Sequence, residues 1–363
     1  MFNDIYRNRT ILVTGHTGFK GSWLALWLTR LGANVVGYAL APPTDPSHFK
    51  LLDMGIRSIE GDIRDGETMK RAFREVQPEA VFHLAAQAIV RRSYQEPAAT
   101  LATNVMGTVH VLEAARACGS VRAIVNVTSD KRYENREWPW GYREIDPLGG
   151  FDPYSASKGC SELITGSWRN SFFNPGSYGR DHHTLLASGR AGNVIGGGDW
   201  AADRLIPDIM RAVHRNERVT IRNPQAVRPW QHVLEPLSGY LLLGQKLLEG
   251  RTEFAEAWNF GPPEEGSATV GEICAQIQAV WPKIDWEIKP QPGQPHEAGL
   301  LRLDCSKARA KLDWSPVWSG KTAIEKTALW YRTFYETGSP RSSEDLDAYI
   351  DGAKDNGMAW AAE

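Results

Sequence analysis

The chain has 363 residues, of which 42% are hydrophobic and 23% charged, and its formal net charge is −2. This composition is typical of a globular protein with a large core, and the lack of a basic excess argues against a nucleic-acid or membrane-surface partner. We expect no signal peptide and no membrane span, because the first residues, MFNDIYRNRT, are polar and no apolar run reaches roughly 18 residues. The four cysteines are far apart and lack metal-ligand spacing, so we expect a cytoplasmic chain with reduced thiols and no metal site.

The first half of the chain alternates short apolar runs with helix-like stretches. We predict strands at 10–15, 34–40, 57–62, 80–86 and 123–129, and helices at 21–32, 66–76 and 100–119. The strand segments are apolar throughout rather than alternating, which predicts a parallel sheet covered on both faces. The predicted fold class is therefore α/β, a Rossmann-type doubly wound sheet with a smaller C-terminal region.

This rhythm breaks after about residue 190, where Pro, Gly and Arg become dense. We divide the chain into a nucleotide-binding unit at 1–192, a second region at 193–335 and a polar tail at 336–363 with no assigned role. Helices are predicted near 235–249 and 269–281. The strand-like segment 256–261 is expected to rejoin the main sheet.

A glycine-rich loop, TGHTGFKG, follows the first predicted strand. Gly15, Gly18 and Gly21 permit a tight turn and let the backbone approach a pyrophosphate at the helix N-terminus. The position of the loop between strand and helix favours a dinucleotide site over a plain turn. The acid expected after strand two is missing from GYALAPP, so this region does not decide between NAD and NADP. Asp62, in GDIRD, is placed to meet the adenine, although a solvated strand-end acid fits almost as well.

The segment YSASK places Tyr154 and Lys158 on one face of a helix. A phenol with an ordinary pKa of about 10 is a poor base, but a neighbouring ammonium group and an oxidised nicotinamide both favour the phenolate. An exposed pair that arose by chance is the alternative. The glycine loop upstream and the strand-end hydroxyl of Ser129 favour an active site.

Asp130 and Lys131 stand side by side where the apolar run VRAIVNV ends. They form either a solvated turn or an acid–base pair at the carboxyl edge of the sheet. The local sequence leaves both readings open.

These motifs, together with FHLAAQ, NVMGT, VTSDKRYEN, AGNVIGGGDW and RPWQHV, span most of the chain. The chain resembles the extended short-chain dehydrogenase/reductase superfamily and, within it, the CDP-glucose 4,6-dehydratases. The resemblance implies bound NAD, oxidation of the sugar at C4, loss of water across C5 and C6, and return of the hydride to C6. It also implies a homodimer formed by helices around 100–118 and 155–170, or a homotetramer, and a place in deoxysugar biosynthesis for lipopolysaccharide O-antigen.

By the same resemblance, Ser129, Tyr154 and Lys158 form the catalytic triad. Asp130 is the expected acid toward the C6 hydroxyl, and Lys131 is either the base at C5 or a positioning group. Related dTDP-glucose dehydratases carry an Asp-Glu pair at this point, so Lys131 departs from the wider dehydratase pattern and matches the CDP-sugar branch.

The resemblance also indicates two sets of binding residues. The expected cofactor-binding residues are Gly15, His16, Thr17, Gly18, Phe19, Gly21, Asp62, Ile63, Leu84, Ala85, Ala86, Asn104, Tyr154 and Lys158. The expected substrate-binding residues are Ser129, Asn193, Arg204, Arg222, Arg228 and Trp230. The guanidinium groups suit phosphate oxygens; a surface salt bridge remains the alternative for each, and Arg228 is favoured because Pro229 and Trp230 follow it.

Three other functions remain open at this point. A nucleotide-sugar 4-epimerase would share the triad and the cofactor but would not need Asp130 as an acid. A dehydratase for another NDP-glucose would differ only in base preference. A noncatalytic NAD-binding scaffold would share the fold, but it would have no reason to keep the whole triad.

Overall fold

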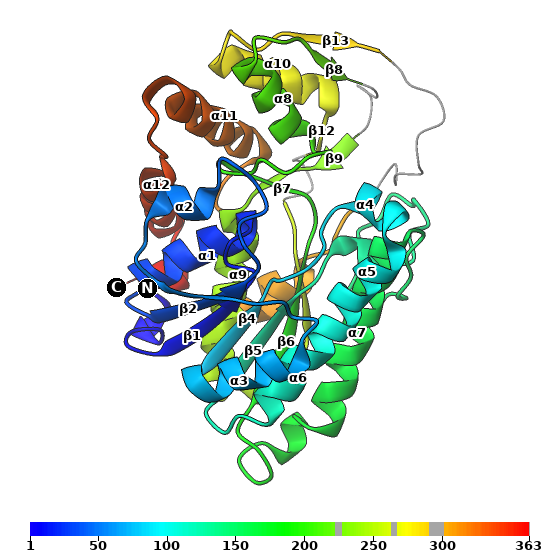
Figure 1. Cartoon of the computed structure of the whole chain (residues 1–363), viewed down its shortest axis with the longest axis vertical. Coiled ribbons are helices and arrows are strands. Elements are labelled where there is room, and N and C mark those ends of the chain that lie inside the picture. The colour runs from blue at the N-terminus through cyan, green and yellow to red at the C-terminus, as the bar shows by residue number, and fades with distance from the viewer. Residues whose placement is uncertain (222–226, 263–266, 290–300, 363) are drawn as a thin grey trace.

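A seven-stranded parallel sheet forms the centre of the computed structural model (Figure 1). The structure describes residues 1–221, 227–262, 267–289 and 301–362, and the side chains at 227, 228 and 267 lie outside that description. The strand order is β3-β2-β1-β4-β5-β6-β11, which confirms the predicted α/β class. The order reverses between β1 and β4, and in such sheets ligands bind outside the carboxyl ends of the strands at this switch point.

The main-sheet strands are β1 (Thr10–Thr14), β2 (Asn34–Ala39), β3 (Arg57–Glu60), β4 (Ala80–His83), β5 (Ala123–Val127), β6 (Leu185–Ala191) and β11 (Ala257–Phe260). The helices are α1 (Phe19–Arg30), α2 (His48–Leu52), α3 (Gly66–Val76), α4 (Val90–Gln95), α5 (Pro97–Leu101), α6 (Gly107–Arg116), α7 (Pro153–Ser171), α8 (Leu205–His214), α9 (Leu234–Leu248), α10 (Val270–Val280), α11 (Gly320–Thr337) and α12 (Ser342–Asp355). No helix in the described ranges combines the length and apolarity required to cross a bilayer.

Both faces of the sheet are covered, as the apolar strands predicted. In β1, Ile11 and Val13 join a core with α1 and α9. Leu12, between them, joins a second core with α3 and α6 on the other face. Successive strand residues point to opposite faces, so a strand buried on both sides must be apolar at every position.

The predicted helix at 100–119 is not continuous. A π-helical turn at Ala102–Met106 separates α5 from α6. The turn carries Asn104, whose amide accepts from the Gln87 backbone N–H at 2.8 Å and donates to Ser157 Oγ at 2.8 Å. These bonds join the helix to α7 and to the loop after β4.

The second half of the chain returns to the sheet twice. β11 pairs in parallel with β6, so the predicted strand at 256–261 rejoins the sheet as expected. α9 also packs on β5 and β6, although it lies within the range predicted for the second region. The remaining pieces form short two-stranded pairs beside α8 and α10 at the top of Figure 1. These pairs are β7 (Val194–Ile195) with β10 (Gln231–His232), β8 (Val219–Ile221) with β13 (Trp286–Ile288), and β9 (Val227–Pro229) with β12 (Ser267–Thr269).

The tail, to which the sequence assigned no role, packs against the nucleotide-binding helix. Ser342, at the start of α12, hydrogen-bonds His48 Nε2 at 2.7 Å, and His48 Nδ1 hydrogen-bonds Ser22 of α1 at 2.7 Å. The Phe2 ring stacks on Trp360 with centroids 5.1 Å apart, which places the two ends of the chain side by side (Figure 1). The tail therefore packs against α1, the helix that follows the glycine loop, and stabilises its position.

Candidate active site

The carboxyl ends of the sheet strands open into a cleft of about 2560 Å³. It is lined by residues from both halves of the chain. The predicted site residues that line it are Gly15, Thr17, Gly18, Phe19, Gly21, Asp62, Ile63, Leu84, Ala85, Ala86, Ser129, Asp130, Lys131, Tyr154, Lys158, Asn193, Arg204 and Trp230. The structure thus brings together residues up to 215 positions apart in the sequence, from Gly15 to Trp230.

Close backbone packing in the glycine loop admits no side chain at two of its positions. Gly15 has a φ of +78°, and a Cβ there would lie 2.7 Å from the backbone nitrogen of Ala85. A Cβ on Gly21 would lie 2.1 Å from the Gly15 carbonyl oxygen. Within the described chain no side chain caps the N-terminus of α1, so its first N–H groups are available to an anion. The residues present therefore fit the phosphates of a dinucleotide.

The part of the cleft expected to hold the adenosine has no acid at the end of β2. Ala39 and Leu40 line it where many nucleotide sites have an acid, and Thr17 Oγ1 donates to the Leu40 carbonyl at 3.0 Å. Asp62 also lines the cleft, and Arg64 donates to its carboxylate at 2.9 Å through Nε. This hydrogen bond lowers the pKa of Asp62, so the carboxylate is ionised and can accept from a ligand.

The side chains of two predicted cofactor residues have hydrogen-bond partners within the protein. The His16 ring is buried against Gly37 of β2 and hydrogen-bonds Ser58 at 2.7 Å. Burial lowers its pKa to about 4, so the ring is neutral at physiological pH. The side-chain amide of Asn104 is hydrogen-bonded to Gln87 and Ser157 at the π-helical turn. Neither side chain is among those that line the cleft in the described chain.

The three residues of the predicted triad meet on one wall of the cleft. Ser129, Tyr154 and Lys158 all line it, and Lys158 Nζ donates to the Val127 carbonyl at 3.4 Å. Burial raises the pKa of Tyr154, and the charge of Lys131 and the nearby Ser129 hydroxyl oppose this only in part. Burial lowers the pKa of Lys158 to about 8. In the protein alone Tyr154 is therefore a neutral phenol, and a further positive charge in the cleft is needed to ionise it.

Asp130 and Lys131 are part of the site and not a solvated turn. Asp130 is 3% exposed, and its Oδ1 accepts from Ser129 Oγ at 3.0 Å and from Lys131 Nζ at 3.4 Å. Lys131 Nζ also donates to Asn193 Oδ1 at 3.2 Å. The backbone turns through Asp130–Arg132 directly after β5, which lets adjacent residues face the same cleft.

Lys20 also lines the cleft, although the sequence analysis assigned it no function. It lies in the first turn of α1, where the helix dipole disfavours a cation, and this mismatch is the signal that could have identified it. Burial lowers the pKa of Lys20 to about 7, and the charges of Arg204 and Lys158 act in the same direction. The cations around Asp130 suit ligands that carry several phosphate charges.

The substrate side of the cleft is described in part. Arg204 Nη1 donates to Asp199 Oδ2 at 2.8 Å while lining the cleft, so it forms a salt bridge and still faces the ligand space. Trp230 is 9% exposed. Arg222 lies outside the described residues. Arg228 is described only by its backbone, which pairs with Ala268 in the β9–β12 ribbon.

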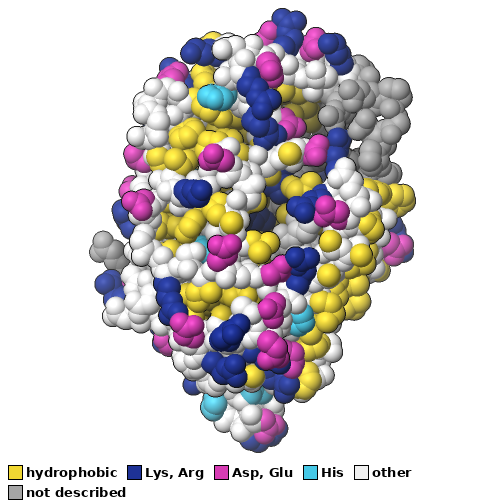
Figure 2. Space-filling model, in the orientation of Figure 1, with side chains coloured by type: hydrophobic (Ala, Val, Ile, Leu, Met, Phe, Trp, Pro, Cys, Tyr) yellow, Lys and Arg dark blue, Asp and Glu magenta, His cyan; other side chains and the backbone are white. Residues whose placement is uncertain are grey.

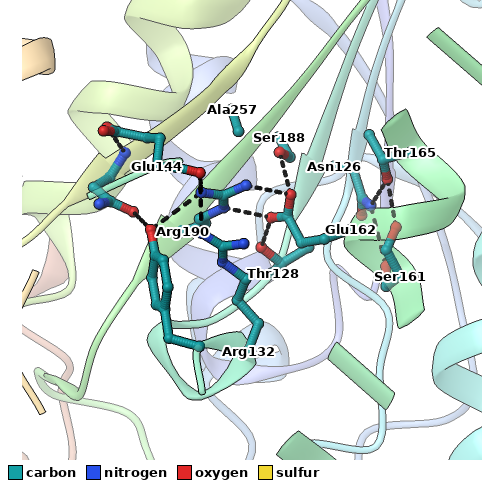
Figure 3. A network of polar contacts seen from close by, with 12 residues as sticks. Asn126, Thr128, Arg132, Glu144, Ser161, Glu162, Thr165, Ser188, Arg190 and Ala257 are labelled. Carbon is teal, nitrogen blue, oxygen red and sulfur yellow. Dashed lines mark hydrogen bonds and ion pairs between the residues drawn. The ribbon is translucent and has the colours of Figure 1, made fainter. Parts of the chain in front are cut away.

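A buried ion pair between α7 and β6 lies behind this wall (Figure 3). Arg190 donates through Nε and Nη2 to the two carboxylate oxygens of Glu162, each at 2.8 Å, and both side chains are 4% exposed. Thr128 and Ser188 donate to the same carboxylate. Burial by itself raises the pKa of Glu162, but Arg190 and these donors lower it to about 2. The carboxylate is therefore ionised and fully hydrogen-bonded.

This network holds both flanks of the Ser129–Lys131 segment. Thr128, on one side, is bonded to Glu162. On the other side, the Arg132 guanidinium lies 3.5 Å from the centre of the Tyr133 ring, and Arg190 Nη1 donates to the Tyr133 hydroxyl at 3.1 Å. The conformation of the Ser129–Lys131 segment thus depends on contacts outside the cleft.

The sequence and the fold both match known nucleotide-sugar enzymes. The family model for GDP-mannose 4,6 dehydratase matches residues 12–327. The chain is similar to the CDP-glucose 4,6-dehydratase of Salmonella typhimurium, with 52% identity over 91% of this chain and 92% of that protein.

Two solved structures share the fold. The dTDP-glucose 4,6-dehydratase of Streptomyces venezuelae, solved with NAD, has a TM-score of 0.73, 25% identity, and coverage of 89% of this chain and 97% of that one. The UDP-glucose 4-epimerase of Thermus thermophilus, in complex with NAD, has a TM-score of 0.75, 25% identity, and coverage of 89% and 99%.

Glu162→Gln should destabilise the fold by about 3–5 kcal/mol, because Arg190 would keep its buried charge without a counter-charge. Denaturant unfolding measures this loss. The control is Glu67→Gln, since Glu67 pairs with Lys70 on the exposed surface of α3 and should barely affect unfolding. The folded pKa of about 2 lies below the ordinary 4.5, so this stabilisation is complete above about pH 4.5 and is lost as the pH falls toward 2. A Glu162→Gln variant with wild-type stability and acid sensitivity would contradict this account.

Proposed function

Since the chain belongs to the GDP-mannose 4,6-dehydratase family, we propose that it is a lyase that converts CDP-glucose to CDP-4-keto-6-deoxyglucose and water, with NAD as its cofactor. When bound, NAD supplies the oxidation at C4 and the reduction at C6 within one turnover. The chain itself binds and orients the sugar and moves the protons.

One observation carries this proposal. A buried carboxyl group and an ammonium group, Asp130 and Lys131, face the same cleft as Ser129 and Tyr154. An oxidation at C4 alone needs only a base for the C4 hydroxyl. A second acid–base pair in the same cleft is what elimination of water requires. The 52% identity to the Salmonella CDP-glucose 4,6-dehydratase supports CDP-glucose as the substrate.

The proposed first step takes place at Tyr154. As a phenolate it accepts the proton of the C4 hydroxyl, while Ser129 hydrogen-bonds the same oxygen. The positive charge of the oxidised nicotinamide and the nearby ammonium group of Lys131 favour the phenolate over the neutral phenol that burial would otherwise impose. The C4 ketone then acidifies the proton on C5.

The elimination step uses the residues of the turn after β5. As a neutral amine Lys131 removes the C5 proton, or as an ammonium group it orients the sugar for that removal, and Asp130, as the carboxylic acid, protonates the leaving C6 hydroxyl. We assign Arg204, Asn193 and Trp230 to the sugar nucleotide because they line the cleft beside this turn. Arg222 and Arg228 stay proposed phosphate contacts on the basis of the sequence.

We further propose a cytoplasmic homodimer that supplies deoxysugars for surface polysaccharide. The free cysteines fit a reducing compartment. Large apolar side chains are exposed along α5, the adjoining turn and α7, namely Leu101, Met106 and Leu163. Figure 2 shows apolar side chains gathered along the right-hand edge of the molecule, over α5 and α7. Such a stripe supports an interface between two copies of the chain.

Purified protein given CDP-glucose and a catalytic amount of NAD should form the 4-keto-6-deoxy product without any added reductant. Mass spectrometry of the product measures the loss of water. Tyr154→Phe should slow the reaction by about 10²–10⁴-fold, because it lacks the base. A 4-epimer with no keto product would point to an epimerase instead, and consumption of one NAD per sugar would contradict internal hydride return.

Asp130→Asn should stop the reaction after C4 oxidation, because the amide cannot deliver a proton to the leaving hydroxyl. Rapid mixing with CDP-glucose should show the absorbance of reduced cofactor rising without product. Lys131→Met should stall likewise if the amine removes the C5 proton, and exchange of that proton with heavy water should then cease. Persistent exchange with weaker binding would identify Lys131 as a positioning group. Full activity in both variants would refute the assignment of an acid–base pair.

Leu163→Glu should convert the dimer to a monomer, because it places a charge in the apolar stripe of α7. Light scattering coupled to gel filtration measures the mass. Ile288→Glu on β13, where Ile288 is 52% exposed, is the matched control and should leave the dimer intact. A monomeric wild-type protein, or a Leu163→Glu variant of unchanged mass, would rule out this interface.

A further inference from the structure

The segments that follow β5 and β6 meet at the edge of the sheet, because the two strands are parallel neighbours. Directly after β5, the Thr128 N–H donates to the Gly189 carbonyl of β6 at 2.9 Å, which keeps the two chains side by side. The chain beyond β5 carries the acid–base pair, Asp130–Lys131. The chain beyond β6 continues into Gly192–Asn193, which line the same cleft. The residues after β6 are therefore placed to act on the pair.

The amine of Lys131 has one acceptor from each segment. Its Nζ donates to Asp130 Oδ1 at 3.4 Å and to Asn193 Oδ1 at 3.2 Å. A neutral amine nitrogen is bonded to Cε and to two hydrogens, and it carries one lone pair. When both hydrogens point to these acceptors, the lone pair is left for the cleft that Lys131 lines. Since a base must be aimed at the proton it removes, Asn193 helps to set the direction in which Lys131 acts.

The carboxyl group of Asp130 is held by the turn on one side and faces Gly192 on the other. Ser129 Oγ and Lys131 Nζ both donate to its Oδ1, at 3.0 Å and 3.4 Å. Oδ2 accepts no hydrogen bond from the described chain, so it is the oxygen left to carry the acidic proton. A Cβ at position 192 would lie 3.1 Å from this Oδ2. The φ of Gly192 lies outside the left-handed region, so a side chain there would displace the carboxyl group without straining the backbone.

We propose that Gly192 and Asn193 are positioning residues for the acid–base pair: Gly192 leaves the space that Asp130 Oδ2 occupies, and Asn193 orients the Lys131 amine toward C5 of the sugar. This inference rests on the proposed dehydratase activity and deepens it by assigning the base to Lys131. Asn193 Nδ2 has no hydrogen-bond partner in the described chain, so the same amide is still free to contact the sugar. Its Oδ1 has a separate task, since a misplacement of about 1 Å can cost on the order of 10²-fold in rate.

Two substrates separate the steps in the NAD-loaded protein. CDP-6-deoxyglucose has no C6 hydroxyl to lose, so the absorbance of the reduced cofactor reports C4 oxidation alone. Mass spectrometry of the same sugar nucleotide recovered from heavy water reports exchange of the C5 proton. CDP-glucose then reports elimination, through formation of the 4-keto-6-deoxy product.

Asn193→Ala should retain C4 oxidation at saturating substrate, because that step uses Ser129, Tyr154 and Lys158. Exchange of the C5 proton and elimination should both fall by about 10²-fold, because the amine is no longer aimed. Asn356→Ala, exposed at the end of α12, is the control and should keep all three rates. If Asn193→Ala binds the sugar more weakly but keeps the wild-type ratio of exchange to oxidation, the positioning role is refuted and Asn193 only contacts the substrate.

Gly192→Ala should retain C4 oxidation and C5 exchange but slow elimination by about tenfold or more, because it displaces the acid and not the base. Reduced cofactor should then accumulate during the reaction with CDP-glucose. Alanine adds only a contact with the end of a side chain, so the variant should fold. Gly119→Ala, where a Cβ would meet nothing within 4 Å, is the matched control.

Full elimination in Gly192→Ala would overturn the role of this glycine. Loss of exchange together with elimination would also overturn it, because the substitution would then act on the base as well as on the acid. Failure of the proposed function is a different result, in which the wild type itself forms no 4-keto product from CDP-glucose.

Discussion

The ion pair between Glu162 and Arg190 is the interaction on which the arrangement of the cleft depends. Two charges buried together must satisfy each other and their remaining hydrogen-bonding atoms, or the fold loses stability. Here the carboxylate takes four donors and the guanidinium also reaches Tyr133 and the Glu144 carbonyl. The pair thereby joins α7 and β6 to both ends of the Ser129–Lys131 segment. The position of Ser129 and Asp130 relative to Tyr154 follows from this tie.

The cleft brings several cationic side chains together, and this arrangement is unfavourable because they repel one another and are partly removed from water. Lys20 has Arg204, Lys158 and Lys131 as positively charged neighbours, and burial lowers the pKa of both Lys20 and Lys158. Ligands with phosphate groups relieve this repulsion, so binding energy and proton affinity are coupled in the same space. The neutral phenol of Tyr154 in the protein alone is part of that coupling. Its ionisation awaits positive charge from the bound cofactor.

Hydrogen bonds between side chains join the N-terminal half of the chain to the C-terminal tail. The Ser22–His48–Ser342 chain of hydrogen bonds runs from α1, just beyond the glycine loop, to the first turn of α12. Trp330 Nε1 donates to the same Ser342 hydroxyl at 2.9 Å. The helix that follows the glycine loop is thus linked to a helix more than 300 residues further along the chain.

The sequence by itself determined the features that depend on neighbouring residues: the parallel sheet from uniformly apolar strands, the cofactor loop from the spacing of Gly15, Gly18 and Gly21, and the Tyr154–Lys158 pair from one helical turn. The resemblance then indicated the chemistry. Only the tertiary structure decided that Lys20 faces Asp130, that the His16 ring is buried away from the cleft and that Asn104 closes a π-helical turn. It also decided that Arg190 meets Glu162 and that Ser129 donates to the carboxyl group of Asp130. Burial and side-chain partners depend on which distant elements pack together, and local spacing carries no record of that packing.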